Sequence, residues 1–317
     1  MKKYYPLIAV LVCCLVVCFH SVGLTAFNCV ANQAGNFSDP AIWSGCNSTY
    51  PQNGDSVALA GYVVTWDSGA GATLPATGAY TSLTSTGTAG QLALDLSSAF
   101  CNSGCALSVT TATAGTKPAN AGIIYTSGST ANVLTLTITT ATGGSATGAT
   151  CINHNSIGAI HMTITNCNGS ATNAAACFVN NSTGTFTFSG QFTGGGGSTN
   201  SHGGENTSTG TGTITGLVKA GAGNSNFGFQ SNSTGAVTLN GSLENTSNCV
   251  AWSGKPPVWA PTATQYLKLS NGTYLYDETT RNTDPTIAKV QSGTNYKIYN
   301  SSLTGTLTTG GGTAWAQ

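Results

Sequence analysis

Charged side chains are the scarcest feature of this chain of 317 residues. Asp, Glu, Lys and Arg together make up 6% of it, and nine acidic residues balance nine basic ones. Between residues 96 and 254 the only charged side chains are Lys117, Lys219, Glu205 and Glu244. Proteins recognise nucleic acids and anionic membranes through clusters of Lys and Arg. The lack of such a cluster argues against both kinds of partner.

Helical patterns are also missing from most of the chain. Beyond Ala26 no segment carries apolar residues at helical spacing, and Gly, Thr, Ser and Asn dominate the composition. A disordered chain is usually charged and poor in β-branched and aromatic residues, which this chain is not. The sequence therefore predicts a folded, all-β protein with a neutral polar surface.

The N-terminus has the organisation of a secretory signal peptide. Lys2 and Lys3 form a basic start, an apolar core runs over residues 7–19, and the small residue Ala26 ends a cleavage sequence. We expect residues 1–26 to be removed on export, with cleavage after Gly23 as an alternative. The apolar core is short for a membrane span of about 20 residues, so an uncleaved anchor is a second alternative. Export predicts a secreted or cell-surface protein without a membrane span after cleavage.

An eight-residue block ending in glycine recurs in the middle of the chain. Its terminal glycines are Gly158, Gly184, Gly210 and Gly235, which gives a nearly constant period of about 26 residues. A fixed period of this length, rich in β-branched residues, Gly and Asn, is typical of stacked solenoids. A regular antiparallel sandwich would not need equivalent side chains at this period.

A short strand with alternating side chains follows each block. The inward apolar positions of the aligned strands are Leu134, Leu136, Ile138, Ile160, Met162, Ile164, Phe186, Phe188, Ile214, Val237 and Leu239. The outward polar positions form two rows: Thr135, His161, Thr187, Thr213 and Thr238, and beside them Thr137, Thr163, Ser189, Thr215 and Asn240. This alternation is that of strands with one dry face and one wet face.

The predicted fold is a right-handed parallel β-helix with coils of about 26 residues, because parallel crossovers are almost always right-handed. We divide the chain into a signal peptide (1–26), an N-terminal cap with the first strands (27–100), solenoid repeats (101–249) and a small C-terminal β region (250–317). Five coils are evident from the repeats. The C-terminal region is richer in aromatic residues and charge, which fits either a capping layer or a docking module.

Eight cysteines remain once the signal peptide is removed, and an even number in an exported protein suggests disulfides. Cys151 and Cys177 share a register in adjacent coils, where the backbone separation suits a bridge. Their alternative is a pair of stacked free thiols. Two local pairs, Cys29 with Cys46 and Cys101 with Cys105, are further candidates.

Several short segments resemble secreted or phage-borne parallel β-helix proteins. Residues 35–43, Gly-Asn-Phe-Ser-Asp-Pro-Ala-Ile-Trp, resemble an N-W-S-D-P-x-x-W motif that caps such solenoids, with Phe37 in place of the usual Trp. The repeats and the segment Val290–Tyr296 are similar to sequences in phage fibres and bacterial surface proteins. The resemblance implies a β-solenoid surface protein. The signal peptide departs from ordinary phage fibres and favours a cellular surface.

Motifs for catalysis and cofactor binding are not found. There is no G-x-S-x-G sequence, no phosphate loop with its Lys, and no paired C-x-x-C for zinc. Glu205 and Glu244 are separated by one and a half coils, so we do not expect the carboxylate pair that glycoside hydrolysis needs. His154, His161 and His202 are isolated, and His161 is expected at the surface. The sequence thus predicts a protein that is not an enzyme and has no metal or cofactor.

Two binding or structural functions remain open, and a polysaccharide-degrading enzyme, a class that parallel β-helices often host, is a less favoured alternative. The first is an extracellular fibre, filament subunit or adhesin, in which a stiff uncharged rod self-associates or attaches to a cell surface. The second is binding of carbohydrate or ice by the outward Thr rows, since a regular Thr-x-Thr array resembles the ice-binding face of some β-solenoid antifreeze proteins. Thr is also simply a favoured polar residue on exposed strands.

Overall fold

The structure is a computed structural model of the chain. It describes residues 26–46, 50–67, 77–85, 90–98, 101, 104–116, 122–172, 174–196, 200–223, 225–247, 249–255, 257–259, 265–268, 274–277, 295–299 and 301–304. The predicted signal peptide lies outside these ranges except for Ala26, as do most of the Val290–Tyr296 segment and much of the C-terminal region. Within the described part of the chain, no helix has the length and apolar character needed to cross a membrane.

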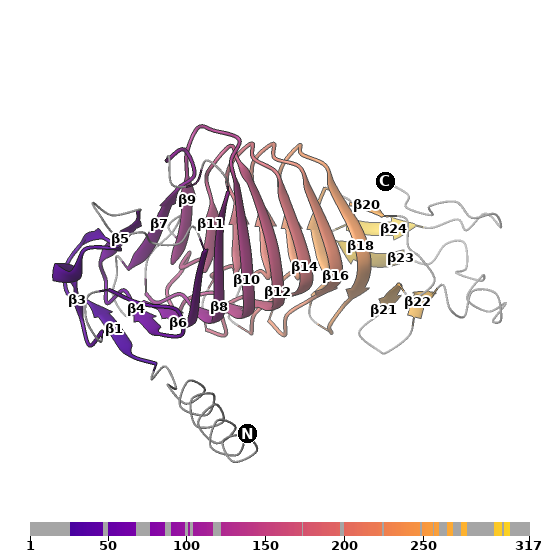
Figure 1. Ribbon diagram of the computed structural model, residues 1–317. Coiled ribbons are helices and arrows are strands. Elements are labelled where there is room, and N and C mark those ends of the chain that lie inside the picture. Colours follow the sequence, from indigo (N-terminus) through magenta and orange to yellow (C-terminus); the bar gives the residue numbers. More distant parts are fainter. Residues whose placement is uncertain are drawn as a thin grey trace, which may run out of the picture.

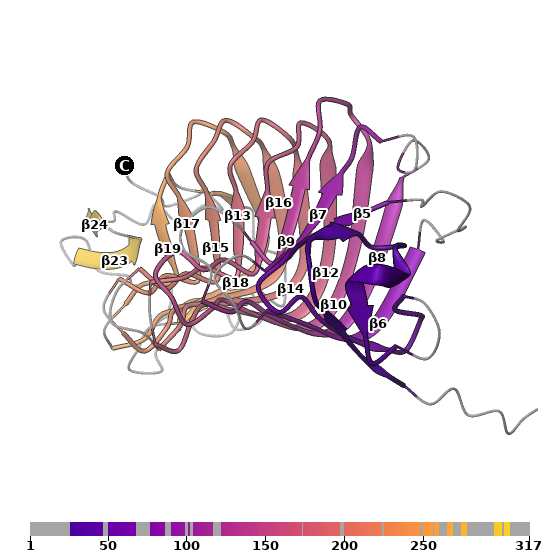
Figure 2. The same cartoon turned by 90° about the vertical axis from the view of Figure 1, so that its left-hand side faces the viewer.

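Two large sheets run along the molecule (Figures 1 and 2). In chain order, sheet A contains β1 (Asn28–Ala31), β3 (Trp43–Ser44), β4 (Ser56–Ala58), β6 (Thr77–Thr84), β8 (Cys105–Thr113), β10 (Val133–Thr142), β12 (Ala159–Asn168), β14 (Phe186–Thr193), β16 (Gly212–Lys219), β18 (Val237–Glu244), β20 (Val258–Trp259), β21 (Tyr266–Lys268) and β22 (Tyr274–Asp277). Sheet B contains β2 (Gly35–Asn36), β5 (Val63–Trp66), β7 (Gln91–Asp95), β9 (Ile124–Ser127), β11 (Ile152–His154), β13 (Phe178–Asn180), β15 (Gly204–Asn206), β17 (Phe229–Ser231) and β19 (Trp252–Gly254). A separate hairpin joins β23 (Asn295–Tyr299) and β24 (Ser301–Thr304).

From β6 to β18, each coil supplies one long strand to sheet A and one shorter strand to sheet B. Successive long strands, such as β10, β12 and β14, pair in parallel, and the short strands β11 and β13 pair in the same way in sheet B. The result is a parallel β-solenoid of about eight turns, which confirms the predicted fold. Parallel pairing begins as early as β1 and β4, so there are more coils than the five evident from the repeats.

Apolar side chains fill the space between the two sheets. All of the positions predicted to face inward are buried, at 2% exposure or less. In the central coils the interior is aromatic: the rings of Phe188 and Phe192 stack with centroids 3.6 Å apart, and Phe178 packs against Phe186. Burial of each large apolar side chain contributes about 1.5–3 kcal/mol. The inward-facing apolar residues of the alternating strands thus form one continuous core.

The long strands bend at a corner where glycine replaces a larger residue. Between β12 and β14 the register shifts after Ile164, so β14 turns the corner with one residue fewer. Gly190 and Gly216 occupy this corner with φ of +135° and +127°. A Cβ at Gly190 would lie 1.8 Å from the carbonyl oxygen of Ile164, and one at Gly216 would lie 2.0 Å from that of Gly190. Only glycine fits such a left-handed corner packed on the coil below.

The repeated eight-residue block forms a short strand of sheet B and the turn that follows it. Its fourth residue points inward, and Asn180 donates from Nδ2 to Oδ1 of Asn206 in the next coil, at 3.0 Å. Asn206 in turn donates to the carbonyl oxygen of Gly210, at 2.9 Å. The serine two residues before the final glycine accepts from its N–H, as Ser182 does from Gly184 at 3.0 Å. Buried polar groups need such partners, which explains why the block repeats.

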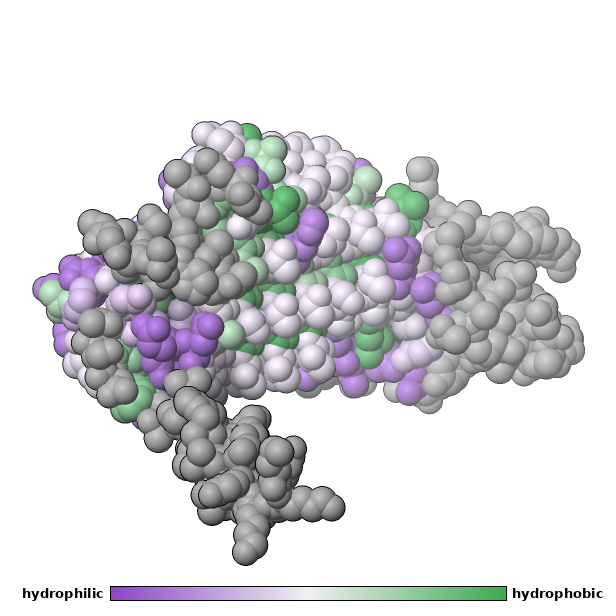
Figure 3. Space-filling view, viewed as in Figure 1, coloured by the Kyte–Doolittle hydropathy of each residue, from purple (hydrophilic) through white to green (hydrophobic). Residues whose placement is uncertain are grey.

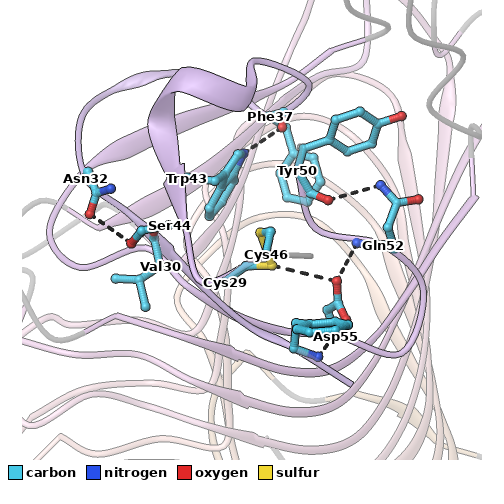
Figure 4. Close-up of a disulfide and its surroundings, with 11 residues drawn as sticks. Cys29, Val30, Asn32, Phe37, Trp43, Ser44, Cys46, Tyr50, Gln52 and Asp55 are labelled. Atoms are coloured by element: carbon cyan, nitrogen blue, oxygen red, sulfur yellow. Dashed lines mark hydrogen bonds between the residues drawn. A yellow bond between two sulfur atoms is a disulfide. The ribbon is translucent and has the colours of Figure 1, made fainter. Parts of the chain in front are cut away.

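A short cap closes the N-terminal end of the solenoid. The 3₁₀ helix η1 (Pro40–Ile42) begins at Asp39, whose side chain accepts from the N–H of Ala41 at 2.9 Å. Phe37 is fully buried and packs edge-on against Trp43, and the Trp43 indole donates to the carbonyl oxygen of Phe37 at 2.8 Å (Figure 4). Phe37 therefore fills the core position that the resemblance assigned to Trp.

Three disulfides are formed within the described residues. Both local pairs that the sequence suggested are present: Cys29–Cys46 in the cap (Figure 4) and Cys101–Cys105 at the start of β8. The predicted bridge between Cys151 and Cys177 is wrong, because Cys177 pairs with Cys167 in the same coil, with 5.6 Å between the Cα atoms.

The geometry of the coil explains why Cys177 pairs with Cys167 rather than with Cys151. Cys151 and Cys177 are neighbours in adjacent parallel coils, where the two Cα–Cβ bonds run side by side. Cys167 instead lies at a core position near the end of β12 and meets Cys177 within one coil, and a disulfide needs Cβ atoms that approach each other. Cys151 stays a buried free thiol, and burial raises its pKa to about 12.

Aromatic side chains cover the last coil at the C-terminal end. Trp252 on β19 is fully buried against Phe229, with ring centroids 4.8 Å apart, and Trp259 on β20 is 3% exposed. Their indole N–H groups donate to the carbonyl oxygens of Lys255 and Gly241, at 2.8 and 2.9 Å. The first residues of the C-terminal region thus extend the core of the solenoid.

Candidate functional site

The two polar rows predicted from the sequence lie side by side on the outer face of sheet A. The backbone register of β10, β12, β14, β16 and β18 aligns the members of each row without a shift. We refer to these ten side chains as the threonine face; it consists of Thr135, His161, Thr187, Thr213 and Thr238 in the first row and Thr137, Thr163, Ser189, Thr215 and Asn240 in the second.

The threonine face is accessible and uncharged. Eight of its ten residues are exposed, and Thr213 and Thr238 are half-buried. Figure 3 shows the surface over β10 to β18 as mostly pale, neither strongly hydrophilic nor strongly hydrophobic. Neighbouring strands are about 4.8 Å apart, and alternate residues along a strand are about 6.6 Å apart. The face is therefore a two-dimensional array of hydroxyl groups with fixed spacing.

The outward rows continue toward the N-terminus, which sequence reasoning missed. Ala106 and Ser108 on β8 align with Thr135 and Thr137. These smaller side chains leave a hollow of about 160 Å³ beside the threonine face. The described residues that line it are Asn53, Gly78, Ala79, Ala106, Leu107, Ser108, Thr135 and Thr137. The paired residues of β8 and β10 are farther apart in the sequence than those of β10 and β12, so the repeat pattern did not reveal them.

Acidic residues of the repeats lie apart from one another. Glu205 is on β15 in sheet B, where burial raises its pKa although Asn232 donates a hydrogen bond to Oε1 at 3.1 Å. Glu244 ends β18 in sheet A, 3.5 Å from the ammonium of Lys219, and accepts from the Tyr266 hydroxyl at 2.7 Å. The two carboxyl groups thus occupy different sheets, as expected from their spacing.

The three histidines of the repeats occupy three different environments. His161 is exposed on the threonine face, as predicted. His154 is fully buried, and burial lowers its pKa to about 4. His202 is 3% exposed and stacks on Phe227, with ring centroids 5.2 Å apart; burial again lowers its pKa to about 4. The burial of these two histidines was not evident from sequence, because His154 lies on β11, which is buried at all three positions, and His202 lies in the connection before β15.

Hydrogen bonds define the tautomer of His154. Its Nε2 lies 3.1 Å from the carbonyl oxygen of Gly158, which can only accept, so Nε2 carries the proton. Its Nδ1 then accepts from the hydroxyl of Thr126, at 2.8 Å. A neutral imidazole with both nitrogens satisfied is a structural group. It holds together two coils and leaves no free nitrogen for chemistry.

Among the described residues, no group of three or more His, Cys, Asp or Glu side chains is arranged so that it could hold a metal ion. The threonine face offers only hydroxyl, amide and imidazole groups, each of which can donate and accept hydrogen bonds. Such a surface can hold a neutral, hydroxyl-rich partner by many weak contacts.

Comparison with known proteins gives no match: no protein-family model, no curated protein and no solved structure resembles the chain closely enough to be matched.

Proposed function

We propose that this protein is an extracellular surface adhesin, in which the solenoid is a stiff spacer and the threonine face binds a neutral polysaccharide. The observation that carries the proposal is the pair of exposed, uncharged rows held in unbroken register across five strands. Hydroxyl and amide groups pair well with sugar hydroxyls, and the lack of charge matches a neutral polymer rather than an acidic one.

Extracellular placement is supported by the disulfides. Three bridges form among the described residues, and disulfides persist mainly in oxidising compartments outside the cytosol. The predicted signal peptide points the same way. An exported rod with a polymer-binding face fits attachment at a cell surface.

The N-terminal end favours an adhesin over a filament built by stacking of coils. An uncapped solenoid end would present open strand edges that pair with another copy. Here the last strand of sheet A is β3 and that of sheet B is β2, each only two residues long. Pro40 in η1 and the Cys29–Cys46 bridge lie in the same cap. Short edges with a nearby Pro are poor templates for pairing.

The regular array also invites a comparison with ice binding. His161 interrupts the first row and Asn240 ends the second, so a lattice match to ice is broken at two positions. A polysaccharide with several hydroxyl groups on each sugar tolerates such changes. We therefore favour carbohydrate over ice.

Binding to insoluble neutral polysaccharides tests the proposal. The full chain is incubated with cellulose, chitin or starch granules, and the bound fraction is measured. Thr163→Lys places a charge at the centre of the threonine face, and we expect at least about tenfold weaker binding, because an ammonium loses water without gaining a partner there. Thr183→Lys is the matched control, since Thr183 is exposed between β13 and β14, outside both rows.

Two results would argue against this function. One is wild-type protein that binds none of the three polymers, and the other is equal binding by Thr163→Lys and the wild type. If the protein binds no polysaccharide but lowers the freezing point of water below its melting point (thermal hysteresis), the threonine face would instead be assigned to ice binding.

A further inference from the structure

A buried carboxylate in the N-terminal cap has no cation beside it in the part of the chain that the structure describes. Asp55, just before β4, is 4% exposed. Its Oδ1 accepts from the backbone N–H of Phe27 and its Oδ2 from that of Gln52, each at 2.8 Å. The sulfur of Cys29 lies 3.7 Å from Oδ2 (Figure 4), but a disulfide sulfur has no hydrogen to donate. Among the described residues no Lys, Arg or His pairs with Asp55.

Burying the Asp55 carboxylate without a positive charge beside it costs folding free energy. Removing a carboxylate from water costs several kcal/mol unless a charge partner and hydrogen bonds compensate. Two neutral amide N–H groups provide hydrogen bonds but no positive charge. A cation placed at one of the two donor positions would complete the site.

Phe27 is held so that its nitrogen stays beside Asp55. The carbonyl oxygen of Phe27 accepts from the N–H of Ser56 at 2.8 Å, and its ring packs against the core. Ala26, the residue before it, is exposed. The bond between Ala26 and Phe27 is also the cleavage site predicted from the signal peptide. The core of the cap therefore begins at the residue that cleavage would make the amino terminus.

We propose that Asp55 is the binding site for the new amino terminus of the processed chain. Hydrolysis of the Ala26–Phe27 peptide bond by an export-associated peptidase consumes one water and leaves a carboxylate on Ala26 and an α-ammonium on Phe27. The ammonium replaces the neutral N–H donor 2.8 Å from Oδ1 and forms an ion pair with Asp55. Processing thereby strengthens the cap as well as releasing the chain.

This ion pair gives the processed chain a distinctive dependence on pH. Pairing with Asp55 raises the pKa of the α-ammonium above its ordinary value of about 7.7–8.0. The added stability is complete below about pH 7.7 and is lost as the pH rises through the raised pKa. Among the described residues, Tyr80 and Tyr50 are further titratable groups near Asp55. Burial, then the charge of Asp55, raises the pKa of Tyr80, so Tyr80 stays neutral over this range.

Export of the full chain from a cell, followed by intact mass measurement, gives the amino terminus, which we expect to be Phe27. Urea unfolding of the exported protein between pH 7 and 9.5 then measures the ion pair. The unfolding equilibrium constant should rise about tenfold for each pKa unit by which Asp55 raises the α-ammonium. Asp55→Asn should remove this rise. Asp67→Asn, which alters the cap carboxylate bound to Ser38, should keep it.

A second variant tests the ion pair between Asp55 and the amino terminus if Asp55→Asn does not fold. Ala26→Phe places a large residue before the cleaved bond and blocks cleavage there, so Phe27 keeps a neutral amide. We expect this chain to fold and to lack the pH-dependent increment. The proposal is overturned by a mature chain that begins elsewhere, for instance at Leu24. It is equally overturned by a wild-type pH profile that matches that of Asp55→Asn or Ala26→Phe.

Discussion

Acid should destabilise this protein through its buried histidines, and His154 offers the cleanest test. The third residue of strands β11, β13 and β15 in sheet B is fully buried, and these residues, His154, Asn180 and Asn206, align in register. Asn206 donates to the carbonyl oxygen of Gly210 as His154 does to that of Gly158. His154→Asn therefore keeps the hydrogen bond and removes the titrating ring.

The magnitude follows from the pKa of His154. Burial lowers it from 6.5 to about 4 in the folded protein. Above pH 6.5 the ring is neutral in both states and has no effect. Between pH 6.5 and 4 the unfolded chain binds a proton that the folded chain does not, so the free energy of unfolding falls, by up to about 3 kcal/mol. Below pH 4 both states are protonated and the loss is complete.

Urea unfolding, followed by the fluorescence of the buried tryptophans, measures this loss at several pH values. At pH 7 we expect His154→Asn to be about 1 kcal/mol less stable than the wild type, because Asn leaves a small cavity. By pH 4 the order should reverse, since only the wild type has lost the contribution of His154. His161→Asn, at an exposed position, should follow the wild-type curve. Parallel curves for His154→Asn and the wild type from pH 7 to 4 would refute this reasoning.

Three further predictions concern the core, the corners and the disulfides. Phe188→Asp places an unpaired carboxylate in the aromatic core and should unfold the central coils, as seen by circular dichroism; unchanged stability would contradict the inward assignment. Gly216→Ala should cost at least about 2 kcal/mol in urea unfolding, whereas Gly196→Ala, whose Cβ would meet nothing closer than 3.6 Å, should cost little; equal effects would exclude corner strain. Cys177→Ser should lose about 2–3 kcal/mol, as expected for a bridge of separation 10, and a peptide map should recover Cys167 with Cys177; a peptide linking Cys177 to Cys151 would be incompatible with the structure.

Periodicity made the central coils predictable. Thr135, His161 and Thr187 are evenly spaced along the chain, so a simple alignment assigned both the inward and the outward side chains of β10, β12 and β14. The alignment did not assign the first coils, because Ala106 and its partner Thr135 are farther apart in the sequence. Additional residues in the connections change this spacing without changing the pairing of strands, and an alignment at fixed period cannot follow them.

Contacts across the interior of a coil could not be predicted from the sequence. Register places Cys151 beside Cys177, but the bridge to Cys167 depends on how the chain curves between β12 and β13. The same limit applies to His154, because strand β11 is buried at all three positions and gives no alternation. Asp55 directly follows Gly54 in the sequence, a context typical of a turn, and only the folded cap brings its carboxylate to the N–H of Phe27.

The glycine corner has a consequence for how long such a molecule can be. Gly190 absorbs a difference of one residue between β12 and β14, and the pairing continues on both sides of it. Gly216 then repeats the same corner in register, so we expect a duplicated or deleted coil to leave the pairing of its neighbours intact. Each added segment of about 26 residues would lengthen the rod by one strand spacing of about 4.8 Å and extend the threonine face by two side chains. The length of the solenoid would therefore change in discrete steps of one coil when a repeat is duplicated or deleted.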